Sequence, residues 1–202
     1  MEYLVTMTTR VPDGTAESDI QGIREREAAR SRELAATGHL LRLWRPPLQP
    51  GEWRSLGLFA ADDPDQLEEV LASMPLRVWR TDEPTPLAPH PNDPAGAGQS
   101  VQQSGGTEFL TTFVTSIPGG TPAEEADVSE AREADRVREL AGEGHLERLW
   151  RLDDKSQVLG LWRAADADDM QAILETLPLY DWMTVQTTTL TSHPSDPPLA
   201  GA

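Results

Sequence analysis

The phrase "ELAATGHLLRLWR" occupies residues 33–45, and "ELAGEGHLERLWR" occupies residues 139–151, 106 positions later. The agreement extends upstream, because residues 26–45 and 132–151 are identical at fifteen of twenty positions. Such agreement exceeds what a shared secondary structure would produce. The 202-residue chain therefore contains an internal duplication.

The duplication covers nearly the whole chain. After the shared Trp-Arg the offset falls to 103, and "SMPLRVW" then matches "TLPLYDW" while "HPNDP" at 90–94 matches "HPSDP" at 193–197. We call 90–94 tail 1 and 193–197 tail 2. The predicted domains are copy 1, residues 1–94, and copy 2, residues 107–202. The intervening "AGAGQSVQQSGG", residues 95–106, has no charge and is rich in Gly, Ser and Gln, which predicts a flexible linker.

Each copy shows the same order of predicted elements. Copy 1 begins with the β-branched stretch "YLVTMTT", continues with a helix that ends at Gly38, and then has the strands "HLLRLWR" and "SLGLFA". A second helix, "PDQLEEVLASM", and a last strand, "RVWRTDEPT", complete it. The order β-α-β-β-α-β in about 95 residues is typical of the ferredoxin-like α+β fold. We expect two such domains in tandem, with their antiparallel sheets packed face to face as a pseudo-dimeric α+β barrel.

Composition limits the function. A net charge of −17 disfavours binding to nucleic acid or to an anionic membrane surface. The chain has no cysteine, no long apolar run and no basic, apolar leader, so we expect a cytoplasmic protein. Without a Gly-rich phosphate loop or metal-ligand spacing, the sequence predicts no cofactor and no metal site.

A glutamate lies on the apolar face of the first helix in both copies. At about 100° per residue, Glu27 falls about 20° from Ile20 and inside the stripe that includes Leu34. Glu133 repeats this placement in copy 2. A buried carboxylate must be paired or protonated, and burial raises its pKa toward neutrality. Glu27 and Glu133 are therefore either general acid/base groups or the acidic members of buried ion pairs, with Arg42 or Arg45 as candidate partners in copy 1.

Arginines on the following strand are candidate substrate ligands. By strict alternation, Arg42 shares a face with Leu40 and Trp44, as Arg148 does with Leu146 and Trp150. A guanidinium there could hold a substrate carboxylate or pair with the helix glutamate. Trp44 and Trp150 could stack on substrate or belong to the core. Arg45 and Arg151 should face the opposite side, at the surface.

Four histidines complete the candidates. His39 and His145 follow the glycine that ends the helix, so they could relay protons at a pocket mouth or lie in a solvated turn. His90 and His193 lie in tails 1 and 2, where we expect turns or contacts between the domains.

The combination of "TMTTRVP", a Glu-bearing helix, Gly followed by "LWR", then "MPL" and "HPND" resembles the muconolactone isomerase family, and copy 2 repeats it. The resemblance implies a ferredoxin-like fold, homo-oligomers, and cofactor-free proton transfer on an unsaturated lactone with the helix carboxylate as acid/base. Where the family has a substrate-binding Tyr-x-Asn pair, copy 1 has Trp53 and Ser55.

We therefore predict a cofactor-independent isomerase or cyclase acting on a lactone-like or polyketide-like small molecule of secondary metabolism. Glu27 and Glu133, with His39 and His145, form the predicted catalytic set. The predicted substrate-binding residues are Arg42, Arg148, Trp44, Trp150, Trp53 and Ser55. The fused pseudo-dimer could further assemble into a homo-oligomer. Two alternatives share the fold: a non-catalytic small-molecule-binding or scaffold protein, and a cofactor-free oxygenase.

Overall fold

The structure is a computed structural model that describes residues 1–97, 105–152 and 157–198. Residues 98–104 of the predicted linker lie outside the described residues. The chain divides into two compact units. Unit 1 comprises Met1–Leu87 and Thr191–Ala202, and unit 2 comprises Ala88–Leu190. Each unit therefore contains the body of one copy and the tail of the other.

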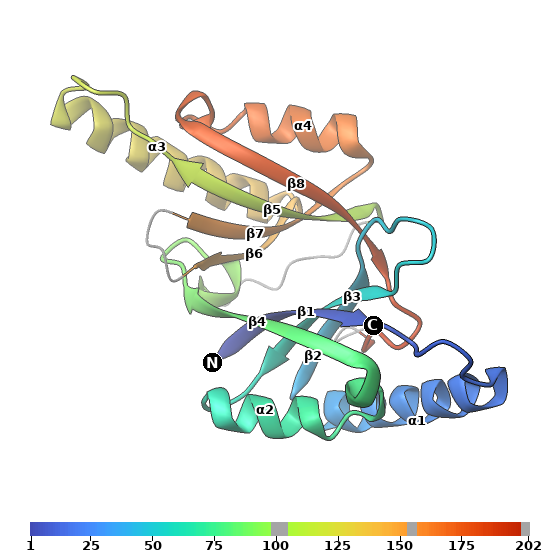
Figure 1. Cartoon of the computed structure of the whole chain (residues 1–202). Helices are drawn as coiled ribbons and strands as arrows, with labels where there is room; N and C mark the ends of the chain where they lie inside the picture. The colour runs from blue at the N-terminus through green and yellow to red at the C-terminus, as the bar shows by residue number, and fades with distance from the viewer. Residues whose placement is uncertain (98–104, 153–156, 199–202) are drawn as a thin grey trace. The chain divides into compact units, whose positions relative to one another are not determined.

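Both units have the predicted α+β, ferredoxin-like element order (Figure 1). Unit 1 contains β1 (Glu2–Thr9), α1 (Glu17–Ala36), β2 (Leu40–Arg45), β3 (Arg54–Ala60), α2 (Pro64–Ala72), η1 (Pro75–Trp79) and most of β4 (Arg80–Pro89). Unit 2 contains η2 (Pro94–Ala97), β5 (Thr107–Thr115), α3 (Ala123–Gly142), β6 (Leu146–Arg151), β7 (Gln157–Ala164), α4 (Ala167–Glu175), η3 (Tyr180–Trp182) and most of β8 (Met183–Ser192).

The two sheets have the same antiparallel topology. In unit 1, β1 pairs with both β3 and β4, and β3 pairs with β2. In unit 2, β5 pairs with both β7 and β8, and β7 pairs with β6. The last residues of β8, Thr191 and Ser192, extend the unit 1 sheet by pairing with β2, and Ala88 and Pro89 of β4 extend the unit 2 sheet by pairing with β6. Packing of the two sheets against each other stays a prediction.

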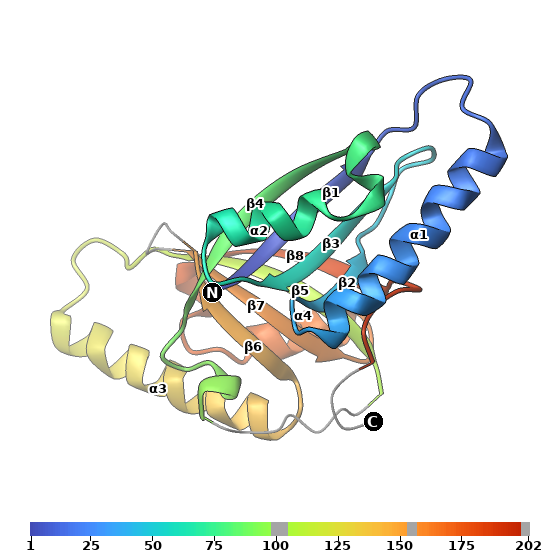
Figure 2. The ribbon, with the colours of Figure 1, turned by 90° about the horizontal axis from the view of Figure 1, so that it is seen from below.

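Helices α1 and α2 lie side by side on one face of the unit 1 sheet (Figure 2). The core of that unit forms between them and the sheet, from residues such as Val5, Leu34, Phe59 and Leu71. Unit 2 has an equivalent core. Gly38 ends the turn after α1 with φ of 76°, a left-handed conformation that glycine adopts without steric cost. The repeated phrase is thus a helix end, a glycine stop and a buried strand.

Candidate active site

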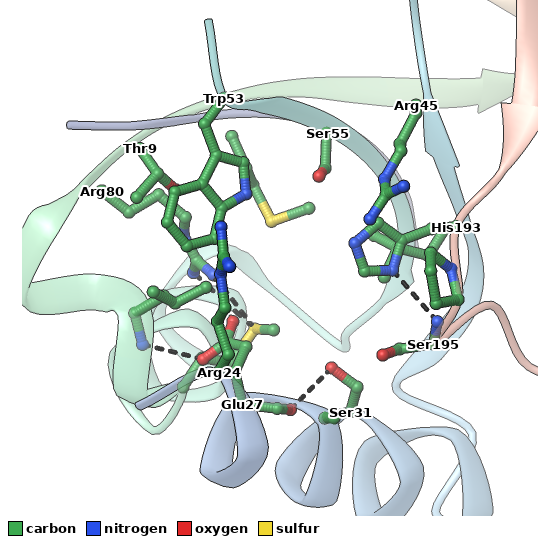
Figure 3. Close-up of a pocket in the computed structure, with 16 residues that line it drawn as sticks. Thr9, Arg24, Glu27, Ser31, Arg45, Trp53, Ser55, Arg80, His193 and Ser195 are labelled. Atoms are coloured by element: carbon green, nitrogen blue, oxygen red, sulfur yellow. Dashed lines mark hydrogen bonds and ion pairs between the residues drawn. The ribbon is translucent and has the colours of Figure 1, made fainter. Parts of the chain in front are cut away.

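Unit 1 contains a pocket of about 280 Å³ between α1 and the helix-covered face of the sheet; we call it pocket 1 (Figure 3). Its polar side chains come from segments far apart in the sequence. The lining residues are Met7, Thr9, Arg24, Glu27, Ala28, Ser31, Leu43, Arg45, Trp53, Ser55, Met74, Leu76, Arg80, His193, Pro194 and Ser195.

Glu27 lies at the floor of pocket 1 and is buried, as the helix pattern predicts. Its Oε2 accepts a hydrogen bond of 2.8 Å from the backbone N–H of Leu76. Its Oε1 accepts one of 2.8 Å from Nη1 of Arg80. Each carboxylate oxygen has a second lone pair, so these bonds leave acceptor capacity for a ligand.

Arg80 connects Glu27 to a second buried carboxylate. Its Nε and Nη2 donate to the two oxygens of Asp82 at 2.5 and 3.0 Å. The side chains of Arg80 and Asp82 are only 2% and 1% exposed. Burial raises the pKa of Glu27, while the Leu76 N–H and the Arg80 guanidinium oppose that rise and Asp82 adds to it. The Glu27 carboxyl is therefore stabilised as an anion yet remains more basic than an exposed glutamate.

Trp53 and Ser55, two of the predicted substrate-binding residues, do line pocket 1. The guanidinium carbon of Arg24 lies 4.5 Å from the centroid of a Trp53 ring (Figure 3). This cation–π contact places a positive charge beside an aromatic surface at the pocket.

Tail 2 supplies the histidine of pocket 1. The backbone N–H of His193 donates to the carbonyl of Leu43 at 3.1 Å. The ring Nδ1 of His193 accepts from the backbone N–H of Ser195, also at 3.1 Å. Burial and the nearby Arg45 guanidinium lower the pKa of His193 to about 4. The neutral ring must carry its proton on Nε2, because Nδ1 is an acceptor. Nε2–H is thus a neutral hydrogen-bond donor of the His193 ring.

Arg42 anchors tail 2. Its guanidinium pairs with Asp196 at 3.2 Å, and its carbon lies 4.8 Å from the centroid of a Trp44 ring. Asp196 also accepts a 2.6 Å hydrogen bond from the Leu43 N–H. Arg42 and Trp44 are not among the residues that line pocket 1, so the partner of Glu27 is Arg80 and the expected pairing with Arg42 is wrong.

A β-bulge explains this error in the assignment of faces. The pairing of β2 with β3 shifts between Leu40 and Arg42, which breaks strict alternation along β2. Leu40 and Leu43 consequently share the core side of the sheet, and Arg45 lines pocket 1. Arg45 is exposed, as expected, but it also lines pocket 1, which the sequence did not predict. The pairing of β6 with β7 shifts in the same way between Leu146 and Arg148.

His39 and His145 do not line pocket 1 or its counterpart in unit 2. Nδ1 of His39 lies 3.0 Å from the carbonyl oxygen of Ala60, and Nδ1 of His145 lies 3.0 Å from that of Arg163. Both histidines precede the first residue of their strand, at the end opposite to Arg45. The geometry therefore offers no support for the predicted proton relay, and the histidines that line the pockets are His193 and His90.

Unit 2 has a pocket at the equivalent place, pocket 2, of about 510 Å³. The half-buried Glu133 lies in it and accepts a 3.0 Å hydrogen bond from the Leu179 N–H. Burial raises the pKa of Glu133, opposed by that one bond. Tail 1 enters this unit, where Asp93 pairs with Arg148 at 3.2 Å. The Arg148 guanidinium carbon lies 4.6 Å from the centroid of a Trp150 ring, so these two residues repeat the anchor seen in unit 1.

Comparison with known proteins decides the family. The sequence model for muconolactone delta-isomerase matches residues 1–93 and again residues 107–196. The chain belongs to this family. Muconolactone delta-isomerase of Cupriavidus pinatubonensis is 29% identical over 87 residues, which cover 43% of this chain and 95% of that protein. Muconolactone delta-isomerase 1 of Acinetobacter lwoffii is 31% identical over 87 residues, covering 43% and 91%. The predicted family is confirmed, and its members' activity supports the expected class of enzyme, an isomerase.

Solved structures support the predicted fold class. A heme-binding protein from Thermus thermophilus aligns with 96% of this chain and 93% of its own at a TM-score of 0.58 and 13% identity. Chlorite dismutase from Candidatus Nitrospira defluvii aligns over 94% and 91% with a TM-score of 0.57 and 11% identity. At these identities the likeness concerns the fold alone.

Within the described residues, no group of three or more His, Asp or Glu side chains is placed to hold a metal ion. No described helix is long and apolar enough to cross a membrane. A cytoplasmic location stays a prediction.

Several residues of this muconolactone isomerase-like site were not predicted from the sequence. Arg80 and Asp82 form a polar pair in copy 1 where copy 2 has Met183 and Val185, so comparing the copies could have marked them as partners. No comparable signal assigns tail 2 to unit 1, because both tails carry the same motif. The other residues missed as site members are Arg24, Arg45, His193 and Ser195.

Proposed function

We propose that pocket 1 is the active site of a cofactor-independent isomerase that moves a proton next to the carbonyl of a small, carboxylate-bearing unsaturated lactone. The observation that carries the proposal is the buried Glu27, held by Arg80 and Leu76 at the floor of a polar pocket. Family membership supplies the reaction class, because the relatives are muconolactone delta-isomerases.

Glu27 has the properties of a general base that must also return its proton. Arg80 keeps it ionised, and burial keeps its basicity above that of a solvated carboxylate. In the proposed step Glu27 takes the proton from the carbon next to the carbonyl, and the C–H electron pair moves into the carbonyl to form an enolate. The protonated Glu27 then returns the proton at the far end of the conjugated system. The double bond shifts and no electrons are gained or lost.

Cationic and neutral donors around Glu27 suit an anionic substrate. Arg24, Arg45 and Arg80 line pocket 1, against a single lining carboxylate, Glu27. Arg80 is already shared by Glu27 and Asp82, which leaves Arg24 and Arg45 to attract a substrate carboxylate. The neutral His193 Nε2–H could donate to the developing enolate oxygen.

A non-catalytic scaffold would be favoured if both helix glutamates were locked to arginines with no cavity beside them. Glu27 and Glu133 each border a cavity, and Glu133 accepts its hydrogen bond from a backbone N–H. These observations favour the isomerase. Larger lactones of polyketide type remain within the proposed substrate class, because Trp53 and Ser55 replace the family's Tyr-x-Asn pair.

The test uses purified full-length protein and a series of carboxylate-bearing unsaturated lactones that begins with muconolactone, followed by NMR. We expect Glu27→Gln to lower kcat by about 10²–10⁴-fold, as loss of a general base does. The matched control is Glu25→Gln, which removes an exposed carboxylate from the same helix. Arg45→Met should raise KM with kcat retained. Unchanged turnover in Glu27→Gln, or oxygen consumption during turnover, would contradict the proposal.

A further inference from the structure

Pocket 2 occupies the same place in its unit as pocket 1, but the polarity and the charge of its lining side chains differ. It lies between α3 and the sheet of unit 2 and receives tail 1, as pocket 1 lies beside α1 and receives tail 2. Its lining residues are His90, Pro91, Asn92, Phe113, Thr115, Ile117, Glu130, Glu133, Val137, Leu149, Val158, Trp162, Leu177, Leu179 and Met183.

Three differences between the pockets run in one direction. At equivalent positions of the two copies, polar side chains of pocket 1 become apolar in pocket 2. The pairs, with the pocket 1 residue first, are Ser31 and Val137, Ser55 and Val158, and Arg80 and Met183. The buried Asp82 likewise corresponds to Val185, which packs against the core of unit 2.

The charge of the lining also reverses. Arg24 of pocket 1 corresponds to Glu130, so the charged side chains that line pocket 2 are Glu130 and Glu133, and no arginine or lysine is among the described residues that line it. Burial and the Arg151 guanidinium lower the pKa of His90 against the opposing effect of Asp93, which leaves its ring neutral at pH 7. Within the part of pocket 2 that the structure describes, an anion would therefore meet two lining carboxylates and no lining arginine or lysine.

We propose that pocket 2 is a second, separate ligand site, which binds an uncharged aromatic small molecule bearing one hydroxyl group. Phe113, Val158 and Trp162 supply the apolar walls, and the volume of about 510 Å³ lies in the range of small-molecule sites. The ligand hydroxyl donates to Glu133, whose Oε2 is occupied by the Leu179 N–H. The duplication has thus produced one polar, cationic pocket and one apolar, anionic pocket.

This site can be tested with 2-naphthol as the probe, because it is uncharged at pH 7, and with 2-naphthoate as its anionic counterpart. Calorimetry on the full chain should show one 2-naphthol site per chain. An excess of 2-naphthoate should not displace 2-naphthol from pocket 2, whether or not 2-naphthoate binds in pocket 1.

The decisive variant is Val137→Ser with Val158→Ser, which installs the residues that copy 1 carries at the same places and should therefore fold. Loss of the buried Val137 and the partly buried Val158 should weaken 2-naphthol binding by about tenfold or more. The matched control is Val128→Ser, since Val128 is on the same helix but 45% exposed and does not line the pocket. A second variant, Met183→Arg, adds a guanidinium to the pocket and should make 2-naphthoate a competitor.

Three results would overturn the proposal. They are the absence of 2-naphthol binding to the wild-type chain, displacement of 2-naphthol by equimolar 2-naphthoate, and unchanged affinity in the double serine variant. None of these results bears on catalysis in pocket 1, so failure here is distinguishable from failure of the proposed isomerase.

Discussion

Replacing Arg80 by methionine removes the cation that two buried carboxylates share. Arg80 contacts Glu27 and Asp82 with a side chain that is 2% exposed, and Asp82 is 1% exposed. Breaking a buried ion pair by deleting one partner costs about 3–5 kcal/mol, because the remaining charge is left in a desolvated site. Without Arg80, Glu27 keeps only the Leu76 N–H among its described partners, and Asp82 keeps only the partly exposed Arg77. We expect Arg80→Met to lower the free energy of unfolding by about that amount.

Copy 2 indicates a second substitution that should restore part of the stability lost in Arg80→Met. Copy 2 carries Met183 and Val185 where copy 1 carries Arg80 and Asp82, and Glu133 retains a backbone N–H donor without a guanidinium. Arg80→Met combined with Asp82→Val should therefore lower the free energy of unfolding by only about 1–2 kcal/mol, since the buried Asp82 carboxylate, which Arg80→Met alone leaves paired with the partly exposed Arg77, is gone. The double variant should then be about 2–3 kcal/mol more stable than Arg80→Met alone.

Urea unfolding, followed by both tryptophan fluorescence and circular dichroism, measures these differences for the wild type, the two single variants and the double variant. Coincident transitions would justify treating the midpoints as free energies. A double variant destabilised by the sum of the two single effects would show that Arg80 and Asp82 do not stabilise each other. Unfolding of Arg80→Met at the wild-type urea concentration would show that Arg80 does not stabilise the fold.

Three further predictions concern pH and the tails. The pKa of Glu133 is raised in the folded state, so the folded state binds more protons than the unfolded state and its stability falls as pH rises through and above 4.5. In urea titrations over that pH range, Glu133→Gln should become more stable relative to the wild type as pH rises. The pKa of His193 is lowered to about 4 from 6.5, so stability falls as pH drops from 6.5 toward 4, and His193→Gln should show a smaller fall in the same titrations. Asp196→Asn removes the anchor of tail 2 on Arg42, so limited proteolysis should cut tail 2 faster and KM at pocket 1 should rise, while 2-naphthol affinity stays unchanged.

Helical periodicity predicted the most informative residues correctly. Counting about 100° per residue from Ile20 places Glu27 in the apolar stripe, and the structure buries it with Ile23, Ser31 and Leu34. The fold followed from the same local signals, because glycine stops, strand propensity and helix periodicity all lie within short windows.

The partners of those residues could not be predicted in the same way. The cation for Glu27 is Arg80, 53 residues downstream, and its selection depends on how α1 and β4 pack. The role of Arg45 at pocket 1 was missed because a bulge in β2 puts Leu43 and Arg45, and not Arg42, on the side of Leu40, and a bulge leaves no mark in the strand's composition. The exchange of tails was beyond sequence reasoning, because "HPNDP" and "HPSDP" would suit either unit.

Proton transfer by Glu27 can be measured as the rate at which deuterium from D₂O enters the lactone next to its carbonyl, followed by NMR. We expect exchange by the wild type, a loss of about 10²–10⁴-fold in Glu27→Gln, and a near wild-type rate in Glu133→Gln. Exchange that survives Glu27→Gln but is abolished by Glu133→Gln would contradict this expectation, and would place the proton transfer in pocket 2.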